Sequence, residues 1–240
     1  MISKNYIPIY ALRFMAFYFI IINAIAIYLF PGGSLYNYEL TSYSFTENFF
    51  SDLGVYETSG GHENFLSCIL FNSTLAMIGF ASFSYIYVPN IFSSNKKAYI
   101  YSVIATVILL LSGICYIGVA LTPADLYFSE HVWFVIFAFH LQTIGILFMV
   151  IAFFLSPANN KYTIVAFIYF ICVAAYSIFE TSSPPPPDFD PRNQEMFKEF
   201  VTYDRMVISV VSQKLITLIA FISTIIFTFG FKSLIDQETK

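Results

Sequence analysis

Residues 99–121 read YIYSVIATVILLLSGICYIGVAL, an uninterrupted run that contains no charged side chain. A hydrocarbon core of about 30 Å needs roughly 20 predominantly apolar residues in helical form, so this run is long enough to cross a bilayer once. The strands of a membrane barrel would be about ten residues long and would alternate apolar with polar residues, which this run does not do. The run therefore predicts a transmembrane helix.

Five further runs of the same kind make up much of the remaining chain. The composition agrees, because 58% apolar residues against only 11% charged ones cannot be arranged as a soluble globule of 240 residues. We therefore predict one all-α domain over residues 1–240, a polytopic membrane bundle of six transmembrane helices with short interfacial helices outside it. The predicted spans are 7–30, 65–88, 99–121, 132–155, 163–180 and 206–231.

The basic residues are distributed unevenly around these spans, and this sets the expected orientation. Seven of the eleven fall on one side of the predicted membrane, whereas thirteen of the fifteen acidic residues fall on the other side or at its membrane boundary. Basic residues concentrate on cytoplasmic loops. We therefore expect a multi-pass protein of the plasma membrane with its N- and C-termini in the cytoplasm. The seven basic residues are Lys4, Arg13, Lys96, Lys97, Lys161, Lys232 and Lys240.

The first span resembles a secretory signal peptide, since Ala24, Ile25 and Ala26 imitate a cleavage site after an apolar stretch. Its apolar run continues to Phe30, which is longer than a signal peptide requires. We therefore expect the first span to be retained as a helix.

The charge and the cysteines exclude some classes of partner. The net charge of −4 averages two unlike surfaces, and no nucleic-acid partner is expected. Membrane lipids are the expected partners, with other membrane protein subunits as a second class. All three cysteines, Cys68, Cys115 and Cys172, lie inside spans at spacings that match no zinc or haem motif, so we interpret them as packing residues. The sequence indicates no metal site and leaves any cofactor open.

The first long connection on the acidic side, residues 31–64, contains a helix signal. Ser44 and Glu47 have the spacing of a capping box, and Gly54 is a natural helix stop, so a short interfacial helix is expected from Phe45 onward. Ser51 and Asp52 would lie in its last turn. An anionic Asp52 near a helix C-terminus is mildly unfavourable, so it is either a local imperfection or a sign that this carboxylate has a partner elsewhere.

The second long connection on that side, residues 180–205, begins with a stiff proline run, Pro184 to Pro187. Residues 196–204 could form another short helix. A solvated loop that spaces two spans is the favoured interpretation of this connection.

Three polar residues within the spans lie at a similar predicted depth, about 10 to 13 Å from the acidic side: Asn72, His140 and Lys214. An unpaired ammonium at that depth is costly, so Lys214 requires an anion. Glu180 is the easiest to reach if the last two spans pack together, and Asp52 and Asp125 are the alternatives.

Asp125 and His131 should flank the mouth of this polar layer. Pro123 ends the third span and Ser129 can cap the fourth, which places His131 in the first turn of a helix. The positive end of the helix dipole disfavours imidazolium there, so the ring stays available as a base or a ligand. His140 follows nine residues later and is expected to face the opposite side, so the two histidines are not a pair for one metal or haem.

At Ser51, Asp52, Asp125, His131 and further positions, the chain resembles the six-helix membrane family labelled domain of unknown function 998. The resemblance covers the first four spans well, and the proline-rich last connection departs from the family pattern. It implies six helices and one constellation formed by Ser51, Asp52, Asn72, Asp125 and His131. It implies no activity. The residues that carry it are Ser51, Asp52, Leu53, Gly54, Phe71, Asn72, Gly113, Gly118, Pro123, Ala124, Asp125 and His131, with Tyr203, Asp204 and Arg205 near the last span.

Three classes of function remain open. In an accessory or structural membrane subunit, the polar layer would fix the register of the helices. In a binding protein, an outward-opening site would hold a lipid headgroup or another small ligand. In a membrane-embedded hydrolase or acyltransferase acting on lipid, the catalytic residues would be Ser51, Asp52, Asp125 and His131, whereas a three-histidine zinc site would need His62 as well. The candidate ligand-binding residues are Asn72, Asp125, His131, His140, Glu180 and Lys214.

Overall fold

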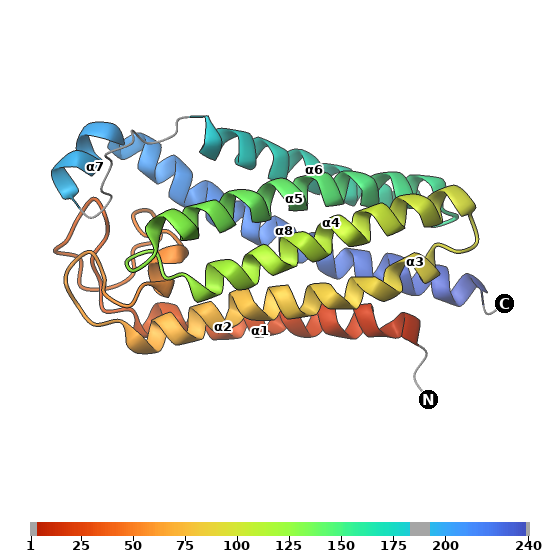
Figure 1. The fold of residues 1–240 in the computed structure, drawn as a ribbon, viewed down its shortest axis with the longest axis horizontal. Helices are drawn as coiled ribbons and strands as arrows, with labels where there is room; N and C mark the ends of the chain where they lie inside the picture. The colour runs from red at the N-terminus through yellow and green to blue at the C-terminus, as the bar shows by residue number, and fades with distance from the viewer. Residues whose placement is uncertain (1–3, 183–192, 239–240) are drawn as a thin grey trace.

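The computed structural model describes residues 4–182 and 193–238, and within them six helices are long and apolar enough to cross a membrane (Figure 1). The prediction of an all-α bundle of membrane-spanning helices is confirmed. The long helices are α1 (Ile7–Leu29), α2 (Phe65–Ser82), α4 (Lys96–Leu121), α5 (Phe128–Leu155), α6 (Asn160–Thr181) and α8 (Tyr203–Glu238). Two short helices continue α2, namely η3 (Phe83–Tyr87) and α3 (Val88–Ile91). The other short helices are η1 (Lys4–Tyr6), η2 (Ser51–Gly54) and α7 (Gln194–Phe200).

Several helices begin earlier than the apolar runs predict, because capping side chains set their ends. The Asn95 side chain accepts hydrogen bonds from the backbone N–H groups of Lys97 and Ala98, so α4 begins at Lys96. Asn159 accepts in the same way from Lys161 and starts α6. These caps lie in polar sequence, which a search for apolar runs does not register.

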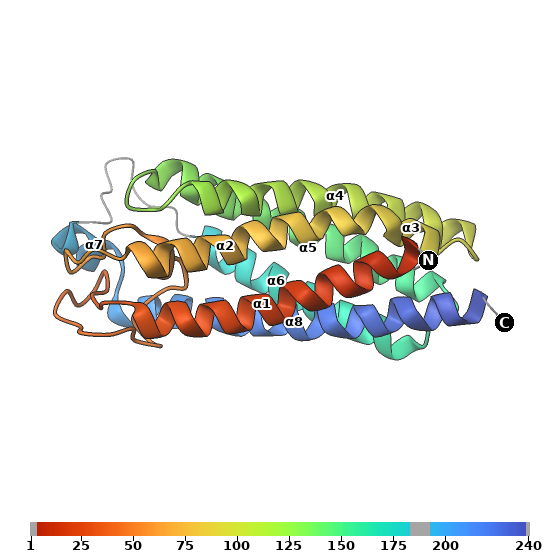
Figure 2. The same cartoon turned by 90° about the horizontal axis from the view of Figure 1, so that it is seen from below.

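The six long helices form a ring in chain order. Each packs against its neighbours in the sequence, and α8 closes the ring against α1. Both described ends of the chain lie at one end of the ring, and the connection between α1 and α2 lies with α7 at the other (Figures 1 and 2). We call these the terminal end and the loop end. The loop end carries the acidic connections, so the segregation of charge along the sequence is also a segregation along the bundle.

The terminal half of the ring is filled by aromatic side chains. Phe92 lies 5.3 Å from Phe153, and Phe153 stacks on Phe231 at 5.7 Å, measured between ring centroids. These three side chains and Phe227 are at most 1% exposed, so we call the four the aromatic plug. Such close packing is typical of a protein interior.

Small residues let α2 and α4 approach closely. A Cβ atom on Gly113 would lie 1.8 Å from the Ser82 hydroxyl oxygen, and one on Gly79 would lie 2.6 Å from the Gly113 carbonyl oxygen. Membrane helices gain van der Waals contact from such interfaces because lipid offers no competing hydrophobic drive.

Candidate functional site

The loop half of the ring contains a cavity of about 850 Å³. Its walls come from residues 30–61, residues 124–140, residues 176–181 at the end of α6, and the side chains of Phe197 and Gln213. We call it the mouth cavity. Its lining is mostly apolar, with carboxylates, hydroxyls and two histidines among the apolar side chains, which is the composition of many small-molecule sites.

Six of the residues singled out from the sequence line this one cavity, whereas Asn72 and Lys214 do not. Asn72 and Lys214 therefore do not share this cavity with His140, and the common depth expected for the three residues stays a prediction. The six residues are Ser51, Asp52, Asp125, His131, His140 and Glu180.

His131 and His140 both line the mouth cavity, even though they lie on opposite sides of α5. A helix turns about 100° per residue, so residues nine apart point in opposite directions. The lining stripe on α5 covers about half the helix circumference, from His131 through Val135, Ile136 and Phe139 to His140. The two histidines stand at its two edges. His140 also contacts α6, where the Ser177 hydroxyl oxygen lies 3.3 Å from its Nδ1.

Asp125 joins the α4–α5 connection to the segment after η2. Its Oδ2 accepts hydrogen bonds from the backbone N–H groups of Tyr56 at 3.0 Å and Glu57 at 2.9 Å. Its Oδ1 is buried and accepts no hydrogen bond from the described residues. One carboxylate oxygen of Asp125 therefore has a structural role, and the other is available to a further partner.

His131 is buried in the first turn of α5, as predicted, at 7% exposure. Its Nδ1 lies 2.7 Å from the Thr122 carbonyl oxygen, and because a carbonyl only accepts, Nδ1 carries a hydrogen and Nε2 is left for other partners. The expected cap at Ser129 is wrong, since the helix begins at Phe128. The Pro123 carbonyl accepts from the N–H groups of Leu126 and Tyr127, and this turn starts the helix before Ser129.

The short helix expected from Phe45 to Gly54 is also wrong, because only the 3-10 turn η2 forms there. Side chains take up the backbone groups that a helix would use. Asn48 Oδ1 accepts from the Ser44 N–H at 2.9 Å, and Asp52 Oδ2 accepts from the Phe49 N–H at 3.0 Å. Ser44 is therefore not the start of a helix.

Asp52 does have hydrogen-bond partners, although the helix end from which we inferred a partner does not form. Its Oδ2 also accepts a hydrogen bond from Asn48 Nδ2 at 3.0 Å. Burial raises the pKa of the Asp52 carboxyl to about 6, and the bonds from Asn48 and Phe49 and the charge of Lys214 act against that rise. The carboxyl therefore titrates close to neutral pH.

Lys214 is 5% exposed and holds the segment around Asn48 against α8. Its ammonium donates to the Asn48 carbonyl oxygen at 2.5 Å and lies between 5.1 and 5.6 Å from the ring centroids of Tyr43, Phe45 and Phe50. Such rings stabilise a desolvated cation. The partner expected for Lys214 therefore needs correction.

Glu180 interacts instead with Ser209 and Arg205, and the carboxylate that acts on Lys214 is Asp52. Arg205 and Lys214 are nine residues apart on α8 and so point in opposite directions. Arg205 faces α6, where it donates to the Phe179 carbonyl at 3.2 Å. Lys214 faces away from α6, which puts Glu180 beyond its reach.

Polar side chains at the start of α2 dock η2. Asn72 Nδ2 donates to the Gly54 carbonyl at 3.0 Å, and Asn64 Nδ2 donates to the carbonyls of Leu53 and Val55. A Cβ atom on Gly54 would lie 2.7 Å from the Phe71 ring, so glycine is required by this close approach. Asn72 thus positions the wall of the cavity from behind.

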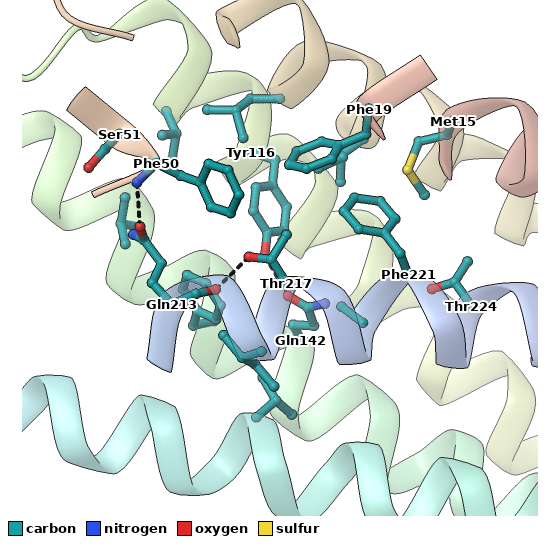
Figure 3. A pocket seen from close by; sticks show the side chains of 18 of the residues that line it. Met15, Phe19, Phe50, Ser51, Tyr116, Gln142, Gln213, Thr217, Phe221 and Thr224 are labelled. Carbon is teal, nitrogen blue, oxygen red and sulfur yellow. Dashed lines mark hydrogen bonds between the residues drawn. The ribbon is translucent and has the colours of Figure 1, made fainter. Parts of the chain in front are cut away.

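A smaller cavity of about 130 Å³ lies on the axis of the ring, and all six long helices contribute to its lining (Figure 3). We call it the inner chamber. Its walls are apolar except for a few amides and hydroxyls, including Gln142 and Gln213. It adjoins the mouth cavity, since five residues line both: Ser51, His131, Val135, Phe139 and Gln213.

The two glutamines organise this chamber, and the sequence analysis missed them. Gln213 Oε1 accepts a hydrogen bond from the Phe50 N–H at 2.7 Å (Figure 3). Gln142 accepts from the Tyr116 hydroxyl at 2.5 Å and donates to that of Tyr169. Both glutamines are amides within membrane spans, where a polar side chain is costly unless it has a partner. This signal, which identified Asn72, could have identified them as well.

The geometry for the expected catalytic chemistry is incomplete. Within the described residues, no hydrogen bond joins Ser51 to a histidine, and no three His, Cys, Asp or Glu side chains come together as a metal site. His62 does not line the mouth cavity. The proline run 184–187 lies outside the described residues, and the short helix expected over 196–204 is present as α7, shifted toward the N-terminus.

Comparison of the chain with protein-family models, with curated proteins and with solved structures finds no match. The resemblance to the family labelled domain of unknown function 998 therefore stays a prediction.

Proposed function

We propose that this integral membrane protein binds an amphiphilic small molecule, with the polar end in the mouth cavity and the apolar end toward the inner chamber. The observation that carries the proposal is the pair of adjoining cavities that share five lining residues. One is wide and bears carboxylates and histidines, and the other is narrow and largely apolar. This sequence of environments matches the two ends of an amphiphile.

The size and lining of the mouth cavity support binding over a purely structural role. Ligand sites typically enclose about 300 to 1,000 Å³ with apolar walls and a few convergent polar groups, and the mouth cavity has 850 Å³. A polar network that only fixed the register of helices would be packed closely, as the aromatic plug is. The accessory-subunit alternative would leave the cavity without a purpose.

A lipid hydrolase or acyltransferase has less support. Nucleophilic catalysis needs a base within hydrogen-bond reach of the nucleophile. His131 and Ser51 both line the mouth cavity, but the Nδ1 of His131 is held by Thr122 and no described contact activates Ser51.

We also propose that the loop end faces the outside of the plasma membrane and the terminal end faces the cytoplasm. The support is the cluster of Lys4, Lys96, Lys97, Lys161 and Lys232 at the terminal end. Reporter fusions after Lys97 and after Lys161 should both report cytoplasm. A signal from the opposite side at either position would reverse the orientation.

The proposed function can be tested by equilibrium binding in phosphatidylcholine nanodiscs. The probes are radiolabelled dodecylamine, dodecanol and dodecanoate, which share one chain and differ in the charge of the head. Empty nanodiscs provide the background from simple partitioning. We expect saturable binding of at least one probe, because a defined cavity has a fixed capacity whereas a bilayer does not.

A substitution in the inner chamber links the binding to the cavity. Ala220 lines the chamber, and Ala220→Leu adds three carbon atoms to a space of about 130 Å³. This change should weaken the saturable component at least about tenfold, which corresponds to about 1.4 kcal/mol. The matched control is Ala24→Leu, at an exposed position on the lipid side of α1. Absence of saturable binding for all three probes would overturn the proposed function.

A further inference from the structure

We propose that the ligand of the mouth cavity carries a positively charged amine at its polar end, so that the chain binds a cationic amphiphile. This inference rests on the proposed function, because it names the class of ligand for the same cavity. It is drawn from the charge of the lining and from two buried carboxylate oxygens that accept no hydrogen bond from the described part of the chain.

Four carboxylates line the mouth cavity: Asp52, Glu57, Asp125 and Glu180. They come from the α1–α2 connection, the α4–α5 connection and the end of α6, so the cavity is acidic on several sides. Of the described residues that form the lining, none is Lys or Arg. Charges interact strongly where water is scarce, so such a cavity attracts cations and disfavours anions.

Two of these carboxylates have an oxygen to spare. Asp125 Oδ1 and Glu180 Oε1 are buried and accept no hydrogen bond from the described residues. Buried polar atoms normally have a partner, and an ammonium group offers three donors to carboxylates. The backbone N–H groups of Tyr56 and Glu57 hold Asp125, so this acceptor is fixed in place.

Among the described residues, no cation fills the need of these two carboxylate oxygens for a partner. Lys214 acts on Asp52 and Arg205 acts on Glu180, but neither cation lines the mouth cavity. Among the described residues, Asp125 receives only two backbone N–H groups. Asp125 is therefore the carboxylate at which a ligand amine adds most.

The ranking of the three probes tests this inference. In phosphatidylcholine nanodiscs at neutral pH, dodecylamine should bind at least about tenfold more tightly than dodecanol, with dodecanoate weakest, because a charge-assisted hydrogen bond is roughly twice as strong as a neutral one. Asp125→Asn should weaken dodecylamine binding at least about tenfold and change dodecanol binding less than about twofold. Asn keeps an acceptor for the N–H groups of Tyr56 and Glu57, so the fold should persist.

Two further variants keep the test decisive. Glu130→Gln removes the same charge from an exposed residue of α5 that does not line the mouth cavity, and it should leave dodecylamine binding unchanged. Glu180→Gln should weaken dodecylamine binding as Asp125→Asn does. If dodecanol binds as tightly as dodecylamine, or if both Asp125→Asn and Glu180→Gln retain dodecylamine, the cationic ligand is wrong while the proposed function stands. If none of the probes saturates, the proposed function fails first.

Discussion

The two halves of the ring solve the same packing problem differently. In the terminal half, Phe92, Phe153, Phe227 and Phe231 fill the axis and are nearly inaccessible. In the loop half, the axis holds the inner chamber, and the mouth cavity opens beyond it. Since the same six helices form both halves, the difference comes from side chains and from the connection that follows α1. Both cavities described above therefore lie in the loop half, and we assign the proposed function to that half.

Positively charged side chains inside the bundle also differ between the two halves. In the terminal half, Arg13 donates from Nε to the Thr228 hydroxyl at 2.8 Å and lies 4.5 Å from the centre of the Phe229 ring. In the loop half, Lys214 uses the Asn48 carbonyl and aromatic rings of the α1–α2 connection. The first contact ties two helices together, whereas the second ties a helix to the wall of the mouth cavity. Lys214 therefore shapes the candidate site without lining it.

The largest expected effect separates the two halves by stability. Phe153→Ala empties part of the aromatic plug and should lower the free energy of unfolding by about 3–5 kcal/mol, as for other large-to-small core changes. Phe128→Ala, on the same helix but facing the mouth cavity, should cost less than about 1 kcal/mol. Unfolding of both variants in detergent micelles measures the difference. Equal losses would mean that the loop half is as closely packed as the terminal half.

The sequence was sufficient for the helices and for six polar residues of the mouth cavity, but not for their contacts. Apolar run length predicted six spans, because hydrocarbon thickness sets that length directly. Asp125 and His131 were expected at a mouth because they lie in a short connection. The link between Lys214 and Asn48 could not be predicted, since it depends on how residues 43–52 fold back on α8.

The acidic connection after α1 shows the limit most clearly. Ser44 and Glu47 have capping-box spacing, yet Asn48 and Asp52 compete for the same backbone groups and only η2 forms. Gly54 was expected as a helix stop, whereas its role is to let η2 approach Phe71. Local patterns offered several hydrogen-bonding solutions here, and tertiary contacts with α2 and α8 selected among them.

The second-largest expected effect is a pH dependence of the free energy of unfolding. It reports on the loop half alone, because Asp52 lies there. Burial raises the pKa of its carboxyl from the ordinary 3.8 to about 6. Between these values the folded state holds a proton that the unfolded state has lost, so stability should fall as pH rises from about 4 to about 6 and then level off. The loss should be on the order of 2–3 kcal/mol.

Asp52→Asn should remove this slope, since an amide oxygen can accept the bonds from Asn48 and Phe49 without a charge. The measurement is the difference in unfolding free energy between variant and wild type across that pH range. Asp204→Asn, at an exposed position in the first turn of α8, is the matched control and should keep the wild-type slope. A variant slope equal to the wild-type slope would show that Asp52 is not the titrating group.

The smallest expected effect concerns the coupling of Lys214 to the acidic lining. Because Lys214 acts on Asp52 and faces away from α6, the pair Lys214→Met and Asp52→Asn should show a coupling free energy of about 1 kcal/mol in a double-mutant cycle. The pair Lys214→Met and Glu180→Gln should be additive within about 0.5 kcal/mol, since Glu180 pairs with Arg205 and Ser209. Unfolding free energies of the five variants at neutral pH give both cycles. Coupling to Glu180 instead of Asp52 would place the ammonium toward α6. Lys214 would then neutralise part of the acidic lining of the mouth cavity. An additive Asp52 pair would mean that the charge of Asp52 contributes little to holding Lys214, and that the Asn48 carbonyl and the aromatic rings are the contacts that hold this wall.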